Sequence, residues 1–291
     1  MIYRLRHLTT YRYEKAVGFA RCALRMTPRE GGDQTLFSHE LVITPTPSRL
    51  ETRTGQFGES VVSAMFATPH RELVIDVRSR VDVNRPVAGP LLFETPWEGA
   101  RAQALAIDSL DVRSPAHFLY PSPMAPIVEA ITGYARASFA PGRPIIEAAF
   151  DLACAIRRDF VYDPESTEIS TPAAEAFAAR RGVCQDFAHI MIAGLRGLGL
   201  PAAYASGFIR TYPAPGKPRL EGADATHAWV DVWCGAEHGW IGFDPTNALI
   251  VAEEHVVVAV GRDYLDVAPI SGIILGPGEQ SIDVGVDLVP E

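Results

Sequence analysis

Residues 182–209 read GVCQDFAHIMIAGLRGLGLPAAYASGFI, and this run decides the expected fold. Apolar residues recur at helical spacing after Cys184, and Gly199 and Pro201 end that pattern. A second apolar run follows the glycine and the proline. We therefore expect a helix that begins at Cys184 and is followed by a strand.

Cys184 is the residue in this run with the clearest chemical potential. The partial positive charge of a helix N-terminus favours a thiolate over a thiol, and a backbone N–H there can donate to a developing oxyanion. A cysteine inside a protein is more often a small buried hydrophobe, so Cys184 needs partners before it is assigned a role. A nucleophilic thiolate requires an imidazole to move protons, and the imidazole requires an acceptor for its other nitrogen.

His227 and Asp244 supply that pair on two predicted strands, 227–234 and 237–244. A two-residue turn at Gly235–Ala236 places His227 directly opposite Asp244. A four-residue loop places them diagonally on one face, and any loop of odd length places them on opposite faces. The two-residue turn is the primary expectation, with both side chains on one face of the hairpin.

Three other histidines compete with His227 for the role of base. His189 follows Cys184 by five residues and lies about 140° around the helix from it, so its ring points away from the sulfur. His238 falls in the predicted turn and is expected to be solvated. His255 precedes an apolar run and is expected to begin a strand as a structural residue.

The other cysteines have packing explanations. Cys154 lies on the apolar stripe of a helix predicted over 143–160, and Cys22 lies on the inward face of a predicted strand. Cys234 has the strand parity opposite to His227. Four cysteines without a CxxC pair form neither a disulfide framework nor a zinc motif, so all of them are expected to be free thiols.

The rest of the chain divides by its periodicity. Alternation with a period of two dominates the N-terminal third, for example over residues 20–26, and helical spacing returns over 124–139. The predicted class is α+β, with an N-terminal antiparallel β domain ahead of an α+β domain. We predict four regions: a β-sheet domain at 1–85, a linker at 86–122, a core at 123–270 and a strand segment at 271–291.

Composition excludes several classes of protein. The chain has 291 residues and a formal net charge of −9, which offers no general electrostatic footprint for nucleic acid or for an anionic membrane surface. The N-terminus carries scattered charges and no apolar stretch, so a cytoplasmic protein is expected. The chain contains no HExxH, GxSxG, GxGxxG or Walker motif, and we expect neither a metal nor a cofactor.

Three segments together carry a family resemblance: GVCQDFAH at 182–189, THAWVDVW at 226–233 and GWIGFDPTN at 239–247. In this order they closely resemble the core of bacterial transglutaminase-like proteins. The likeness extends upstream through FVYDPESTEISTPAAEAFAARRG and downstream through VAVGRDYLDVAPISG. The opening YRLRHLTTYRYEKAV, with LRMTPRE, resembles the N-terminal domain of one bacterial branch, so nearly the whole chain is covered.

The resemblance implies a papain-like core in which the cysteine begins a central helix packed on an antiparallel sheet. It also implies a triad of Cys184, His227 and Asp244 that performs acyl transfer through a thioester. The substrate class is then a peptide, a protein or a small amide, and the N–H of Cys184 is expected to form part of an oxyanion hole.

Three further side chains are candidates for contacting the substrate. Tyr162 lies just upstream of the nucleophile's loop, although an aromatic residue there also suits packing. Asp186 either sets a charge near the helix start or caps it, and Trp229 either lines the acyl site or belongs to the core. The alternative function is a non-catalytic peptide- or protein-binding module that keeps this fold.

Overall fold

The N-terminal alternation produces a sandwich of two antiparallel four-stranded sheets. The computed structural model describes residues 1–85, 95–212, 222 and 226–291. One sheet has the order β15-β1-β6-β3 and the other β14-β2-β5-β4. The strands are β1 (Ile2–Val17), β2 (Phe19–Leu24), β3 (Gln34–Thr44), β4 (Arg49–Thr54), β5 (Ser60–Phe66), β6 (His70–Val83), β14 (Ile270–Leu275) and β15 (Gln280–Pro290).

The inner faces of the two sheets enclose a core of their own. The small and apolar residues at 20, 22, 24 and 26 are all buried, as the alternation predicts, and Cys22 is among them. They pack against Leu73, Ile75 and Val77 of β6 in the facing sheet. The period of two therefore marks the strand and also the face that is buried.

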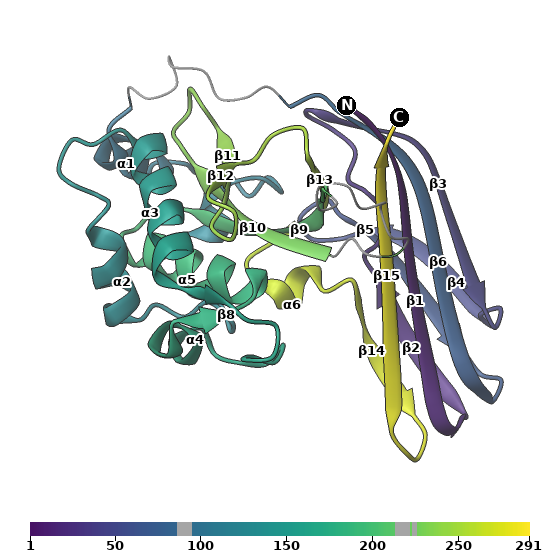
Figure 1. Cartoon of the computed structure of the whole chain (residues 1–291). Helices are drawn as coiled ribbons and strands as arrows, with labels where there is room; N and C mark the ends of the chain where they lie inside the picture. The colour runs from purple at the N-terminus through teal and green to yellow at the C-terminus, as the bar shows by residue number, and fades with distance from the viewer. Residues whose placement is uncertain (86–94, 213–221, 223–225) are drawn as a thin grey trace.

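The C-terminal strands complete this sandwich. β14 pairs with β2, and β15 pairs with β1 over most of its length. The N–H of Glu291 also donates to the carbonyl of Ile2 at 2.9 Å, and the two chain ends lie side by side (Figure 1). The sequence predicts a separate strand segment at 271–291, whereas these residues are integral to both sheets of the N-terminal domain.

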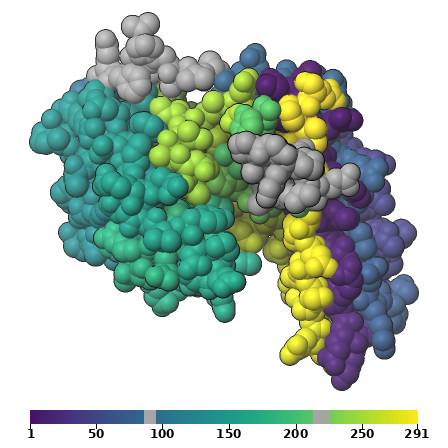
Figure 2. Space-filling model, viewed as in Figure 1, coloured from purple at the N-terminus to yellow at the C-terminus, as the bar shows by residue number. Residues whose placement is uncertain are grey.

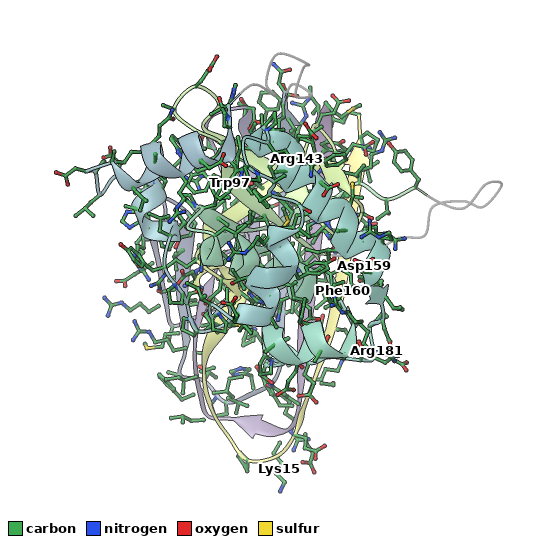
Figure 3. The ribbon with its side chains drawn as sticks, turned by 90° about the vertical axis from the view of Figure 1, so that its left-hand side faces the viewer. Lys15, Trp97, Arg143, Asp159, Phe160 and Arg181 are labelled. Atoms are coloured by element: carbon green, nitrogen blue, oxygen red, sulfur yellow. The ribbon has the colours of Figure 1, made fainter. Side chains whose placement is uncertain are left out.

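The second part of the molecule is a five-stranded antiparallel sheet with a helical layer on one face (Figures 1 and 3). Its strand order is β12-β11-β10-β9-β13, and a separate short parallel pair, β7 with β8, contacts α4 and α5 through β8. The strands are β7 (Val161–Tyr162), β8 (Arg181–Gly182), β9 (Ala202–Ile209), β10 (Thr226–Trp233), β11 (Trp240–Asp244), β12 (Leu249–Ile250) and β13 (His255–Gly261). The helices are α1 (Trp97–Leu105), η2 (Pro115–Phe118), α2 (Glu129–Arg136), α3 (Ile145–Asp159), α4 (Ala173–Ala179), α5 (Cys184–Gly197) and α6 (Tyr264–Val267).

Two sequence expectations for this part need correction. The predicted linker lies partly outside the described residues, but its described part holds α1 and η2, whose Ala100, Ala104 and Phe118 are buried. The helix expected over 124–139 begins only at Glu129. Pro126 keeps Ala125 out of the helical conformation, and Val128 is extended and serves as the N-cap, so the helix starts one residue later.

Helix α5 is the centre of the core and is buried along most of its length. A Cβ atom on Gly194 would come within 2.7 Å of the Ala135 Cβ, so the glycine lets α2 approach closely. Near its N-terminus, the Phe187 ring lies 5.8 Å from the ring of Phe160, which Figure 3 labels at the end of α3. Contacts at both ends therefore fix the helix that begins at Cys184.

The sandwich docks on β13, the edge strand of the five-stranded sheet. The Gln34 side chain donates to the carbonyl of Val257 at 2.9 Å and accepts from the Val257 N–H at 2.8 Å. Arg85 pairs with Asp33 and donates to the carbonyl of His255 at 3.2 Å. One amide side chain thus satisfies edge-strand groups that would otherwise be open to another chain. In the space-filling view a recess remains between the helical part and the C-terminal strands, below this junction (Figure 2).

The docked C-terminal strand provides a test of this architecture. Leu288 is 1% exposed in the main core, whereas Ile282 on the same strand is 50% exposed. We expect Leu288→Ala to lower the free energy of unfolding by about 2–5 kcal/mol and Ile282→Ala to change it by less than about 0.5 kcal/mol. Urea unfolding of the full chain measures both values, and similar losses in the two variants would contradict the packing described here.

Candidate active site

The loop before α5 is held by the side chain of Asp186. The carboxylate accepts from the Val183 N–H at 2.9 Å and from the Thr167 hydroxyl at 2.6 Å, and it is 1% exposed. A Cβ atom on Gly182 would lie only 2.6 Å from the carboxylate, so this close approach requires glycine. Asp186 therefore caps the helix that starts with Cys184, and this buried position is the capping alternative weighed from the sequence.

Cys184 is half-buried at the first position of α5. The first intrahelical hydrogen bond near it runs from the Phe187 N–H to the Val183 carbonyl. The N–H groups of Cys184 and Gln185 precede that bond, so they have no acceptor within the helix. A thiol and two backbone donors without an intrahelical acceptor thus lie together at the positive end of the helix dipole.

The β10–β11 hairpin differs from the primary expectation. Trp233 pairs with Trp240, and the Cys234 N–H donates to the carbonyl of Gly239 at 2.8 Å, which leaves a four-residue loop. The predicted two-residue turn is wrong. Gly235 and Gly239 both have positive φ, so a glycine stands at each end of the longer loop. The observed register is the one expected for a four-residue loop, and it places His227 and Asp244 diagonally on the same face of the hairpin.

Asp244 is the most densely bonded side chain of the site, and it is fully buried. Its Oδ1 accepts from the backbone N–H groups of Thr246 at 2.8 Å and Asn247 at 3.1 Å. Its Oδ2 accepts from His227 Nε2 at 2.8 Å, from Asn247 Nδ2 at 2.7 Å and from His255 Nε2 at 3.4 Å. Burial alone would raise the pKa of Asp244, but these hydrogen bonds hold it well below its ordinary range.

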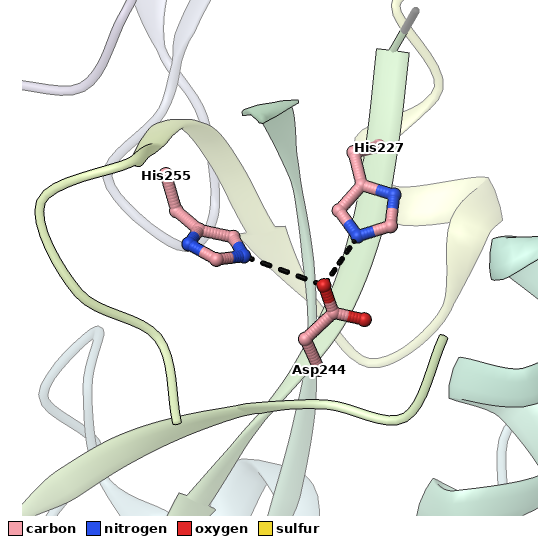
Figure 4. A group of neighbouring side chains, drawn as sticks. All are labelled: His227, Asp244 and His255. Carbon is pink, nitrogen blue, oxygen red and sulfur yellow. Dashed lines mark hydrogen bonds and ion pairs between the residues drawn. The ribbon is translucent and has the colours of Figure 1, made fainter. Parts of the chain in front are cut away.

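His227 links Asp244 to Cys184. Burial lowers the pKa of His227, but the hydrogen bond with Asp244 and the interaction with Cys184 outweigh burial and raise it to about 10. Because Nε2 faces the carboxylate, Nδ1 is the nitrogen left for the thiol (Figure 4). Cys184, His227 and Asp244 therefore form one connected path for a proton, and their catalytic roles remain a prediction.

His255 is a member of the site that sequence reasoning placed only at a strand start. It is 2% exposed, its Nε2 shares Asp244 Oδ2 with His227, and Figure 4 shows the two rings on either side of the carboxylate. Burial lowers the pKa of His255, so it is neutral while His227 is charged. No spacing in the sequence indicates this contact, because β13 enters the sheet beside β9.

The ligand atoms of His227, Asp244 and His255 lie within 4.8 Å of one another, a grouping that could also hold a metal ion. Backbone N–H groups and the Asn247 amide already occupy the carboxylate, however. A metal would have to replace both histidine hydrogen bonds to Asp244. The hydrogen-bond donors around Asp244 therefore suit a carboxylate that orients histidine rings better than a carboxylate that binds a metal ion.

The remaining candidates occupy different surroundings. Tyr162 is 51% exposed on β7, which pairs with the Gly182 segment, and both burial and the charge of Cys184 raise its pKa. It thus lies at the rim of the site, where its contact with a substrate stays a prediction. Trp229 is fully buried, and its ring contacts those of His227 and His255. It belongs to a core cluster and does not face the solvent.

The other histidines and cysteines are clearly placed. His189 is buried, accepts from the Tyr264 N–H at 3.2 Å and is a structural residue. His238 lies in the hairpin loop but is half-buried against Thr95 rather than fully solvated. Cys234 is buried just after the end of β10, and Cys154 on α3 is half-buried.

Comparison with known proteins gives the family. Residues 3–82 match the bacterial transglutaminase-like N-terminal region, and residues 132–245 match the transglutaminase-like superfamily. An uncharacterised protein of Mycobacterium tuberculosis is 43% identical over an alignment of 304 positions. The alignment covers 99% of this chain and 92% of that protein. The chain belongs to the bacterial transglutaminase-like family. This superfamily includes cysteine-dependent acyltransferases and proteases.

Two further relatives of this transglutaminase-like protein carry functional descriptions. A Pseudomonas aeruginosa protein-glutamine gamma-glutamyltransferase is 32% identical over 135 residues, which cover 41% of this chain and 20% of that enzyme. A Cytophaga hutchinsonii structure, provisionally described as a cysteine protease, has a TM-score of 0.78 at 22% identity and covers 99% of this chain and 90% of its own. That likeness confirms the predicted α+β fold. Among the described residues, no helix has the length and apolar character needed to cross a membrane.

The charge on His227 can be measured directly. Asp244→Asn keeps the side-chain shape and removes the charge, so we expect the pKa of His227 to fall by roughly 1–3 units from its raised value. In the native chain His227 is an imidazolium at neutral pH and loses its proton only as the pH rises. The pKa of His227 in both proteins is measured by NMR, from the dependence of the imidazole Cε1–H chemical shift on pH.

His189 is the internal control, because burial lowers its pKa to about 4 and it does not touch Asp244. Its titration should be the same in both proteins. Unchanged titration of His227 in the Asp244→Asn variant would contradict the hydrogen-bonded path.

Proposed function

We propose that this protein is a cysteine-dependent acyl-transfer enzyme that cleaves the C–N bond of a carboxamide or peptide through a thioester on Cys184. The observation that supports it most is the position of His227, which hydrogen-bonds to Asp244 at 2.8 Å and interacts with Cys184. Nucleophilic acyl transfer requires a thiol next to an imidazole, and a carboxylate that orients the imidazole from its other side.

In the first half-reaction the Cys184 thiolate attacks the carbonyl carbon, and a C–S bond forms. The oxyanion that develops can accept from the N–H of Cys184, which has no partner within the helix. His227 then donates its proton to the departing nitrogen, the C–N bond breaks, and ammonia or an amine leaves. Asp244 keeps the imidazolium oriented and stabilises its charge throughout.

In the second half-reaction water or an amine resolves the thioester. His227, now neutral, accepts the proton of the attacking group, and the C–S bond breaks to return the thiolate. With water the enzyme is an amidase or peptidase, and with an amine it is an acyltransferase. We propose a peptide, a protein or a small amide as the acyl donor.

The test supplies both acceptors at once. Glutamine-containing peptides are incubated with the full chain, with and without a fluorescent primary amine, and ammonia release, peptide cleavage and amine incorporation are measured. We expect turnover by the native protein and a loss of at least about a thousandfold in Cys184→Ala, because the nucleophile is removed. Amine incorporation above hydrolysis would identify an acyltransferase.

Cys154→Ala is the matched control, since Cys154 is also a half-buried free thiol. It should retain native turnover. Peptides that bind saturably to the native protein without any turnover would overturn the proposal in favour of a peptide-binding module.

A further inference from the structure

A cavity of about 270 Å³ lies between the sandwich and the five-stranded sheet. Trp229 and Asp231 of β10 line it, whereas Val230 and Val232, which alternate with them, pack in the core that includes helix α5. The cavity is therefore on the face of the sheet opposite to α5, and Cys184 and Asp244 do not line it. Its volume suits a small metabolite rather than a peptide.

Charged side chains from both parts of the molecule face this space. Arg29 and Arg85 come from the sandwich, while Arg113 and Asp231 come from the core. Asp33 neutralises Arg85 in an ion pair. Within residues 1–85, 95–212, 222 and 226–291, neither the Arg29 nor the Arg113 guanidinium has a salt bridge or a hydrogen-bond acceptor.

Asp231 is the unpaired carboxylate among these arginines. It has no hydrogen-bond partner in the described part of the chain, although the charges of Arg113, Arg85 and Arg29 all act on it. Burial raises the pKa of Asp231 against those three charges. The wall thus presents two unpaired cations, the half-buried Arg29 and the solvent-exposed Arg113, and one half-buried unpaired carboxylate, so a ligand with one net negative charge would complement it.

Trp229 links the cavity wall to the candidate active site. Its indole is fully buried in the cavity wall, and its Nε1–H has no acceptor among the described residues. A buried indole N–H ordinarily has an acceptor. The same ring lies 6.1 Å from the ring of His227 and 5.2 Å from that of His255, so the cavity wall touches the histidines of the candidate active site.

We propose that this cavity binds a small anionic amino acid, with a carboxylate facing Arg29 and Arg113 and its ammonium group facing Asp231. The carboxylate supplies the acceptors that the guanidinium groups lack, and the ammonium supplies the donors that Asp231 lacks. This site is separate from Cys184 and does not depend on acyl transfer. Its occupant would lie next to the wall that contains Trp229, whose ring contacts both active-site histidines.

The experiment is calorimetric titration of the full chain with L-glutamate and, separately, with glutarate, which has the same carbon chain without the ammonium group. Cys184→Ala protein is used throughout, so turnover and its failure do not affect the result. We expect saturable binding of L-glutamate, with weaker binding of glutarate. Arg113→Gln should weaken both ligands by roughly tenfold or more, since it removes a charged hydrogen-bond donor.

Two more variants keep the outcome decisive. Asp231→Asn should lower the affinity for L-glutamate and leave the affinity for glutarate unchanged. The difference in affinity between the two ligands should therefore largely disappear. Arg53→Gln changes an exposed arginine on β4, away from the cavity, and should bind like the parent. Absence of saturable heat at about 10 mM of either ligand, or equal affinity in Arg113→Gln and Arg53→Gln, would overturn the proposal.

Discussion

The buried carboxylate of Asp244 is the group on which the geometry of the site depends. It is fully buried, and two backbone N–H groups, one amide and two imidazoles donate to it. Removing one partner of such a buried pair leaves an uncompensated charge, at a cost of about 3–5 kcal/mol. The carboxylate therefore holds the imidazole of His227 in one orientation, with the other nitrogen directed to the thiol.

The fold supports this arrangement from both sides. Asp186 and the absence of a side chain at Gly182 fix the turn that presents Cys184 at the start of α5. On the other side, Gln34 and Arg85 of the sandwich bond to β13, the strand that begins with His255. The N-terminal domain thus braces the sheet that carries the histidines, and the cavity next to Trp229 is a consequence of the same junction.

Much of the fold and part of the candidate site can be predicted from local sequence patterns. The period-two alternation predicts the strands of the sandwich, and the helix start at Cys184 follows from residues 182–201. The loop length between β10 and β11 does not, because glycines at both 235 and 239 suit two loop lengths. The pairing of β14 and β15 with β2 and β1, and the contact of His255 with Asp244, depend on long-range topology that no local pattern encodes.

We propose that His227 and Asp244 make Cys184 the nucleophile that receives the acyl group from the substrate. The most direct measurement is mass spectrometry of acid-quenched protein after brief exposure to an activated ester such as 4-nitrophenyl acetate. The claim predicts an acyl group on Cys184 that forms much faster than on the half-buried Cys154 and is lost when hydroxylamine is added. Equal acylation of Cys184 and Cys154, or rapid acylation that persists in the His227→Gln variant, would contradict it.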